Sequence, residues 1–274
     1  MTSGTSRGTV SKIQEYWNER ARSQAASGQA TTNDIYLREL ELRAFAGMLK
    51  KLSLSAGVLV LDAGCGDGET TLRLAEQLPS LSFEGVDYAA GMVEAAHHRL
   101  QGGAARGNVK FQQGDVMKLC EIFSERLFDV VLTDRCLINL ETEADQAVAM
   151  ASLAAVLRPG GWYIAVENFM EGQDNMNAAR RGAGLQDIPV RWHNLFFTES
   201  SFRKAANPWF EAPEFHDFAS SYYLVTRVAY AASCRLRGVA PDYRDPIHQS
   251  AVDLPVTGCF SPVRMAVLKR KEMQ

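Results

Sequence analysis

The stretch VLVLDAGCGDGETT, residues 58–71, combines residue types that could hold a ligand against bare backbone. An aliphatic run ends at Asp62, and Gly64, Gly66 and Gly68 follow at alternate positions. In open α/β sheets, ligands bind outside the carboxyl ends of the strands, and the first strand-to-helix turn brings backbone against them. This turn is therefore the first candidate binding element.

Neither common phosphate-binding motif fits the turn. The dinucleotide fingerprint requires a glycine at the sixth position counted from Gly64, where this chain has Glu69. A P-loop requires a lysine and a Ser or Thr after the glycines, and no such pair follows here. Asp62 and Asp67 would also repel a pyrophosphate. A ligand with a cationic part fits the turn better.

Carboxylates close or follow the five predicted strands of this region: Asp62, Asp87, Asp115, Asp134 and Glu167. The carboxyl ends of parallel strands share one edge of a sheet, so these acids would form one rim. Asp87 comes about twenty residues after the glycine turn, where an acid can accept both hydroxyls of a ribose. Asp115 could accept from an adenine amino group. Each acid alone could instead cap a turn or helix. Together they favour a ligand with an amine, a ribose diol and an adenine.

Strand and helix patterns alternate through this region. The strands are predicted at 58–62, 82–87, 109–114, 128–133 and 162–168, and the helices between them at 68–78, 90–100, 118–123 and 143–157. Strands that are nearly all apolar belong in a parallel sheet covered on both faces by helices. The sequence therefore predicts a doubly wound, Rossmann-like α/β domain.

The two ends of the chain are organised differently. Residues 1–57 predict helices within 12–23 and 34–52, joined by the small-residue linker QAASGQATTN. After Glu167 we expect, in order, a polar loop at 170–195, a helix at 199–206, a strand at 210–218, a helix at 220–237 and a strand at 261–269. The stretch 219–259 is long for a connection and is a candidate lid. We therefore divide the chain at 57/58, with 58–274 as the main domain.

Composition limits the partners and the compartment. The formal net charge of −3 provides no global field for a polyanion, so no nucleic acid partner is expected. The five cysteines are scattered without metal-ligand spacing, which predicts reduced thiols in a cytoplasmic protein and no bound metal. The N-terminus is polar, and the longest apolar run is short and contains Arg227. A soluble protein without a membrane partner is expected.

Five segments, in order, resemble the motifs of the class I S-adenosylmethionine-dependent methyltransferases: VLVLDAGCGDGET, GVDYAAGMVEAA, VKFQQGDVMKL, FDVVLTDRCLINL and LAAVLRPGGWYIAVE. The similarity covers about residues 55–170 and is to the branch with small-molecule and quinone-biosynthesis enzymes. It implies a seven-stranded mixed sheet with an antiparallel last strand. It also implies S-adenosylmethionine as cofactor, S-adenosylhomocysteine as product, and an N-terminal helical cap over the cofactor.

The resemblance also implies cofactor contacts. Along the methionine part it places Asp62, Gly64 and Gly66, with the carboxylate near the start of the helix at Gly68. The remaining implied contacts are Asp87 at the ribose, Tyr88 and Met92 beside the adenine, Asp115 and the Val116 backbone at its edge, Asp134 and Arg135 near the amino group, and Tyr16 in the cap. Cys65 fills a small-residue position in the turn and is interpreted as packing there rather than as a nucleophile.

The expected reaction is in-line transfer of a methyl group to oxygen, nitrogen or carbon of a small-molecule acceptor, driven mainly by positioning. His193 is the candidate general base, with a loop-structuring hydrogen bond as the alternative. The candidate substrate contacts are Asn139, Glu167, His193, Tyr222 and Tyr223, for which capping or packing is the alternative. The chain lacks the Asn/Asp-Pro-Pro-Tyr/Phe element of nucleic-acid amino-methylases, since TDRCL stands in its place.

Two other functional classes stay open at this point. An RNA or protein methyltransferase would need a local basic face, which net charge does not reveal. A methyltransferase fold that only binds would be expected to lose a glycine or Asp87, and this chain keeps both. A homo-oligomer is possible on the sequence alone.

Overall fold

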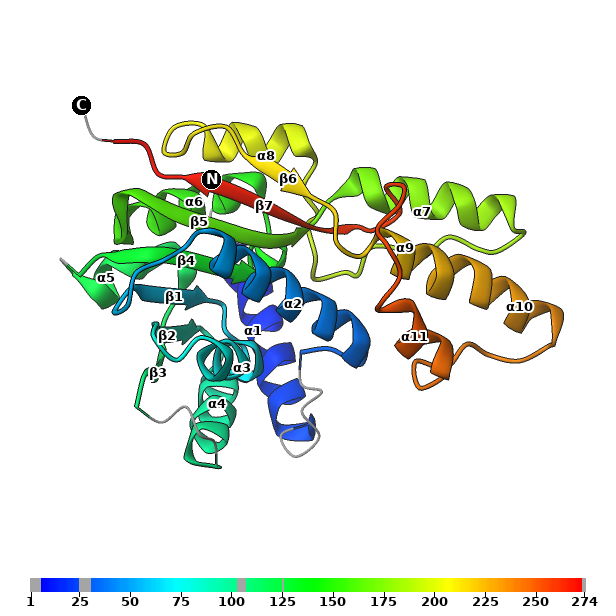
Figure 1. Cartoon of the computed structure of the whole chain (residues 1–274), viewed down its shortest axis with the longest axis horizontal. Helices are drawn as coiled ribbons and strands as arrows, with labels where there is room; N and C mark the ends of the chain where they lie inside the picture. Colours follow the sequence, from blue (N-terminus) through cyan, green and yellow to red (C-terminus); the bar gives the residue numbers. More distant parts are fainter. Residues whose placement is uncertain (1–5, 25–30, 103–106, 125, 273–274) are drawn as a thin grey trace.

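The computed structural model describes residues 6–24, 31–102, 107–124 and 126–272. Its centre is a seven-stranded sheet in the order β3-β2-β1-β4-β5-β7-β6 (Figure 1). The strands are β1 (Leu59–Ala63), β2 (Ser82–Asp87), β3 (Val109–Gln113), β4 (Phe128–Asp134), β5 (Leu157–Asn168), β6 (Glu214–His216) and β7 (Val263–Lys269).

The pairing of the strands confirms the predicted mixed sheet. Strands β1 to β5 pair with one another in parallel, and β7 runs antiparallel to both β5 and β6. The chain moves outward from β1 to β3 and then returns to place β4 on the other side of β1. Strand order therefore reverses between β1 and β4, and a crevice for ligands opens at the carboxyl ends of strands at such a point.

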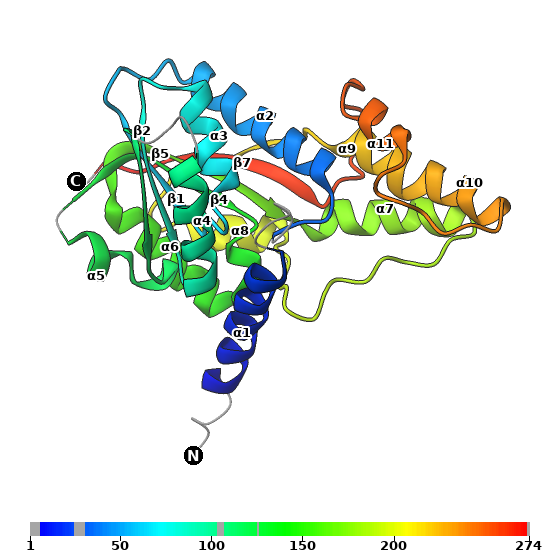
Figure 2. The ribbon, with the colours of Figure 1, turned by 90° about the horizontal axis from the view of Figure 1, so that it is seen from below.

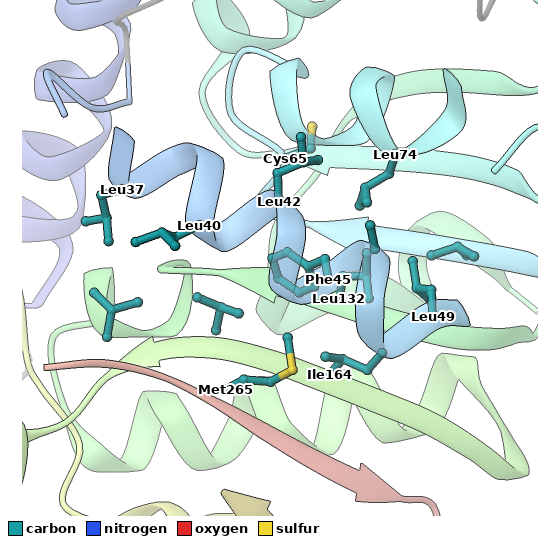
Figure 3. Packing of buried hydrophobic residues seen from close by; sticks show 14 of the residues in the cluster. Leu37, Leu40, Leu42, Phe45, Leu49, Cys65, Leu74, Leu132, Ile164 and Met265 are labelled. Carbon is teal, nitrogen blue, oxygen red and sulfur yellow. The ribbon is translucent and has the colours of Figure 1, made fainter. Parts of the chain in front are cut away.

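Side chains of the central strands alternate between two cores. Leu132 and Ile164 face the core that contains α2 and α3, whereas Val131 and Tyr163 face the core that contains α6 and α8. Figure 3 shows the first core, where α2 lies across Leu132, Ile164 and Met265 of three strands. Because both faces are covered, the strands read as continuous apolar runs in the sequence.

The helices form a layer on each face of the sheet. The first core is covered by α2 (Ile35–Lys51), α3 (Glu69–Gln77) and α4 (Ala90–Gly102). The second is covered by α5 (Leu119–Phe123), α6 (Glu143–Val156) and α8 (Glu199–Ala206). Helix α1 (Ser6–Gln24) lies against α4 and outside the two cores (Figure 2). Gln14 Nε2 donates to Tyr88 O, and Gly91 N donates to Asn18 Oδ1, both at 2.9 Å.

The expected polar loop at 170–195 is wrong in its first half, which forms α7 (Met170–Gly182). The buried positions of α7 include Gln173, Met176 and Asn177, so its packed face is largely polar. Gln173 and Asn177 both donate to Ile188 O, and Ile188 N donates back to Asn177. A helix that buries hydrogen-bonded amides gives no apolar periodicity, which is why the pattern missed it.

The insertion before the last strand is mainly helical. It contains α9 (Ser220–Tyr223), a π-helical segment η3 (Leu224–Ala229), α10 (Tyr230–Leu236) and α11 (Pro246–Ala251). The segment η3 packs against α7, and α11 packs against η3 and α9 (Figures 1 and 2). The predicted helix at 220–237 is confirmed. The predicted strand at 210–218 shortens to Glu214–His216, because Pro213 has no N–H for the sheet. The division at 57/58 and the lid at 219–259 stay predictions. Residues 25–30 of the predicted linker lie outside the described residues.

Candidate active site

Three adjacent hollows open at the carboxyl ends of the parallel strands, and all three are lined by Gly64. The central hollow, of about 270 Å³, reaches from Asp87 to His193 and Tyr223. The β3-side hollow, of about 350 Å³, is bordered by Asp115 and Val116. The glycine-turn hollow, of about 40 Å³, is bordered by Asp62 and Arg135.

The glycine turn needs its glycines for two reasons. Gly64 has φ +82°, and a Cβ there would lie 2.6 Å from Cys136 Cβ. Gly68, the N-cap of α3, has φ +74°, and a Cβ would lie 2.7 Å from the Phe111 ring. Gly64 N and Cys65 N both donate to Val86 O, at 2.7 and 3.0 Å, which ties the turn to β2. The left-handed turn can therefore pack closely while its backbone lines the hollows.

Asp62 is buried at the base of the glycine-turn hollow, which is also lined by Thr70 and Asp134. Thr71 Oγ1 donates to Asp62 Oδ2 at 2.5 Å. Burial raises the pKa of Asp62 to about 7, the Thr71 hydrogen bond opposes the rise, and Asp134 and Asp87 add to it. The charged form is thus short of partners in the protein itself, and a cationic ligand group would supply one.

Asp87 is held in place by two backbone amides. Its Oδ2 accepts from Gly66 N and its Oδ1 from Ala89 N, both at 2.9 Å. Burial raises the pKa of Asp87 to about 6 against the effect of these two bonds. An ionised carboxylate has about four acceptor positions, so two remain for hydroxyl donors from a ligand. Asp87 borders both the central and the β3-side hollow.

The predicted adenine side of the site forms the β3-side hollow. Met117 N donates to Asp115 Oδ1 at 2.9 Å, so one oxygen of this acid caps a short helical turn. Capping was the alternative role that the sequence left open for Asp115. Tyr88 lines the same hollow, and its buried hydroxyl has no hydrogen-bond partner among the described residues. Met92 lines the central hollow and packs against Ala21 of α1.

Arg135 joins the rim to α2. It has φ +51°, unusual for a residue with a side chain, and its guanidinium Nε lies 2.9 Å from Glu41 Oε1 and 3.6 Å from Asp134 Oδ1. Glu41 is fully buried in α2. Burial raises the pKa of Glu41, while the charge of Arg135 opposes that rise. The sequence reasoning missed Glu41; the available signal was a charged residue inside the apolar stripe of its helix.

Some of the predicted substrate contacts line the central hollow. Asn139 Nδ2 donates to Arg135 O at 2.7 Å, and Asn194 Nδ2 donates to Asn139 Oδ1 at 3.1 Å. The ring of His193 packs 4.7 Å, centre to centre, from that of Tyr16. Burial, with a contribution from Arg191, lowers the pKa of His193 to about 4. Tyr223 also lines the hollow, whereas Tyr16 does not line it and packs against His193 and Trp17, which do.

Glu167 and Tyr222, two of the predicted substrate contacts, are not among the residues that line the three hollows. Glu167 is fully buried and accepts from Cys136 N and Leu137 N at 3.2 and 3.0 Å. Strand alternation turns Glu167 to the face of α6, away from the central hollow. Tyr222 donates its hydroxyl to Asp34 Oδ1 at 2.7 Å. Glu167 thus positions backbone beside the site, and Tyr222 holds the carboxylate of Asp34.

Several lining residues carried no recognisable signal in the sequence. Asp34 caps α2 and forms an ion pair with Arg227 of the π-helical segment, and both border the central hollow. Asn168, Gln173 and Pro262 also border it. They come from the N-terminal segment, the end of β5, α7, the insertion and the residue before β7, and only the folded chain brings them together.

The central part of the chain is similar in sequence to known methyltransferases. Residues 60–161 match a family model described as a methyltransferase domain. A demethylmenaquinone methyltransferase from Lactobacillus johnsonii is 34% identical over 113 residues, which are 41% of this chain and 44% of that protein. The chain thus spans less than half the length of the curated relatives it matches.

Solved structures resemble nearly the whole chain in fold. Magnesium protoporphyrin IX methyltransferase from Synechocystis PCC 6803, with bound S-adenosylhomocysteine, has a TM-score of 0.61 at 18% identity, covering 95% of this chain and 99% of that one. The cyclase SpnF has a TM-score of 0.56 at 20% identity, covering 84% and 82%. At these identities the likeness concerns the fold, and the second structure is described as a cyclase.

Residues 60–161, which include nearly all of strand β1, strands β2 to β4 and the glycine turn, are therefore similar to methyltransferase domains. Helices of the described residues include none that is both long and apolar enough to cross a bilayer.

Proposed function

We propose that this protein transfers a methyl group from S-adenosylmethionine to oxygen, nitrogen or carbon of a small-molecule acceptor. The observation that carries the proposal is the meeting of three differently lined hollows at the backbone of Gly64. A donor with an adenosine, a methionine and a reactive centre between them needs two compartments, and its acceptor needs a third.

The residues present fit the cofactor part by part. Asp87 would hold the ribose hydroxyls, and the unpartnered Tyr88 hydroxyl and Asp115 would border the adenine in the β3-side hollow. Asp62 and Asp134 would hold the ammonium group beside the glycine turn. The buried acids also favour a positive sulfonium over a phosphate. The acceptor would then lie in the central hollow, which is the one that His193 and Tyr223 line.

The bound cofactor would supply an already activated methyl group, so the protein's task is mainly to align the reactants. Alignment of this kind is worth up to about 7–11 kcal/mol in favourable cases. The turn at Gly64 is fixed by its bonds to Val86, and Asn139 is fixed between Arg135 and Asn194, so the walls are rigid. His193 stays neutral at pH 7, because burial lowers its pKa to about 4. It would take up an acceptor proton while the transfer proceeds, but its lowered pKa makes it a weaker base than a histidine with a pKa near 7, so its contribution falls below the usual factor of about 10²–10⁴.

Two findings support the assignment to small molecules. The curated relatives that match at 31–34% identity are named demethylmenaquinone methyltransferases, which act on a small molecule by their names. The central hollow is bounded on several sides by α1, α7 and the insertion, so it would enclose a compact acceptor better than a polymer.

Calorimetric titration with S-adenosylmethionine and S-adenosylhomocysteine tests the cofactor, with Asp87→Ala expected to weaken binding at least tenfold. Asp174→Ala, at an exposed acid of α7, is the matched control and should bind normally. Labelled S-adenosylmethionine and fractionated small-molecule extract then test transfer, through a mass gain of one methyl. Tight binding without transfer to any fraction would favour a binding module instead.

A further inference from the structure

Two side chains in the central hollow are buried and hold polar atoms without partners among the described residues: Asn168 Oδ1 and His193 Nδ1. Asn168 is 8% exposed and His193 is 5% exposed. A buried polar atom without a partner is costly and uncommon in folded proteins. Both atoms therefore point to a ligand that completes their hydrogen bonds.

Asn168 occupies a position where the sheet would otherwise place an apolar residue. It follows Ile164 and Val166 at alternate positions of β5, and both of those lie in the core under α2. Its neighbour across the sheet, Val263, belongs to the same core and also lines the central hollow. The backbone of Asn168 is engaged by Phe197 N, while its side-chain amide bonds to none of the described residues. No packing role within the described part of the chain requires an amide here.

The main charged groups around the hollow and the Gln173 amide are already paired, whereas the Tyr88 hydroxyl, like Asn168 Oδ1, has no partner among the described residues. Arg227 is bound to Asp34, and Arg135 to Glu41. Gln173 donates to Ile188 O. Arg191 is exposed at the rim, so the described interior holds no unpaired cation for an acidic substrate. The positive potential of Arg191, which contributes to the lowered pKa of His193, also disfavours an ammonium group beside that ring.

Aromatic side chains make up much of the remaining wall. Five aromatic side chains line the hollow, with aliphatic ones between them: Trp17, Tyr88, Phe196, Tyr223 and Tyr243. Aromatic side chains pack well against a ring and offer few hydrogen bonds to a chain of polar groups.

We infer that Asn168 is a specificity-determining residue, whose Oδ1 accepts a hydrogen bond from an uncharged hydroxyl on an aromatic acceptor held in the central hollow. The assignment rests on the proposed function, in which this hollow receives the acceptor. His193 lines the same hollow and would meet a hydroxyl of the same ring.

Three probes test the inference: 4-phenylphenol, its methyl ether and 4-phenylbenzoate, titrated by calorimetry with and without saturating S-adenosylhomocysteine. The phenol should bind at least fivefold more tightly than the ether, which cannot donate, and than the anionic benzoate. Asn168→Leu should bring phenol and ether within twofold of each other. Asn168→Asp keeps an acceptor oxygen and should preserve the preference for the phenol.

Stability separates recognition from structure. Asn168→Leu should keep or raise Tm, because it replaces an unpartnered amide by an apolar group in an apolar core. Asn175→Leu, at an exposed amide on α7, is the control and should leave the phenol preference intact. A lower Tm for Asn168→Leu, an unchanged preference in that variant, or tighter binding of the benzoate would overturn the inference. Failure of S-adenosylhomocysteine to bind would instead overturn the proposed function, and the titrations without it would still decide the role of Asn168.

Discussion

At the residue scale, two of the rim acids, Asp62 and Asp87, are buried and form no ion pair with a cation among the described residues. Burial raises the pKa of Asp62 to about 7 and that of Asp87 to about 6. For an acid whose folded pKa is raised, the favourable contribution to stability is present at low pH and is lost as pH rises through the folded pKa. Ionisation of Asp62 and Asp87 therefore lowers the stability of the fold toward neutral pH. A cationic ligand that donates hydrogen bonds to these acids would offset this loss.

Cofactor affinity should consequently rise with pH. Ribose hydroxyls and a positive group need the ionised acids, so the Kd for S-adenosylmethionine should fall by about tenfold between pH 5.5 and pH 7.5, on the basis that one pKa unit corresponds to one power of ten. Calorimetry in two buffers of different ionisation enthalpy should detect proton release near pH 6. Asp87→Asn should bind weakly and lose the lower part of this dependence. A flat profile in the native protein would contradict the assignment.

The glycine turn gives a second prediction at this scale. Gly64→Ala would force a Cβ against Cys136 at φ +82°, and we expect a loss of about 1–3 kcal/mol in the free energy of unfolding together with loss of cofactor binding. Gly47→Ala in α2 is the control, since a Cβ there meets nothing within 4 Å. Helix propensity should make that variant about 1 kcal/mol more stable. Urea unfolding measures both, and equal effects would refute the steric argument.

At the element scale, α2 is tied to the end of β4 by the buried Glu41 and Arg135 pair. Removal of one partner of a buried ion pair typically costs about 3–5 kcal/mol, because the other charge remains buried. Replacement of both by apolar residues of similar volume is often close to neutral. The pair thus fixes where α2 meets the rim more than it adds net stability.

We predict that Glu41→Leu lowers the free energy of unfolding by about 3–5 kcal/mol and that Glu41→Leu with Arg135→Met restores most of the loss. Urea unfolding gives both values. Glu76→Leu, at an exposed position of α3, is the control and should change stability by less than about 0.5 kcal/mol. A double variant as unstable as the single one would show that Arg135 has another essential partner.

Hydrophobic spacing predicted the helices and strands correctly where the buried face of the element is apolar. Strands β1 to β5 and the helices between them follow from continuous apolar runs and helical spacing. Helix α7 was missed because its buried face carries Gln173 and Asn177, which are satisfied by the distant backbone of Ile188. A single sequence does not show that such a partner will be available.

At the scale of the whole molecule, α1 completes the site from outside the sheet. Gln14 and Asn18 hold it against Tyr88 and Gly91, at the end of β2 and the start of α4 (Figure 2). The rings of Tyr16 and Trp17 also contact His193. The helix is therefore placed to slow the release of a cofactor bound at Asp87.

The combined change Gln14→Ala and Asn18→Ala removes two hydrogen bonds worth about 0.5–1.5 kcal/mol each. We expect the dissociation rate of S-adenosylmethionine to rise by about three- to tenfold, with little change in the association rate. Stopped-flow fluorescence of Trp17 would follow both rates. Glu19→Ala, at an exposed position of α1, should leave them unaltered. Unchanged dissociation in the double variant would remove α1 from the account of cofactor retention.

The sequence by itself determined the sheet, the glycine turn and the acids at the strand ends, because each depends on a few residues adjacent in the chain. Only the tertiary structure decided which of those groups face a hollow. Alternation along β5 turned Glu167 into the core under α6 and Asn168 toward the central hollow, and α2 supplied Glu41 to Arg135. These outcomes depend on contacts between residues far apart in the sequence, which local patterns do not encode.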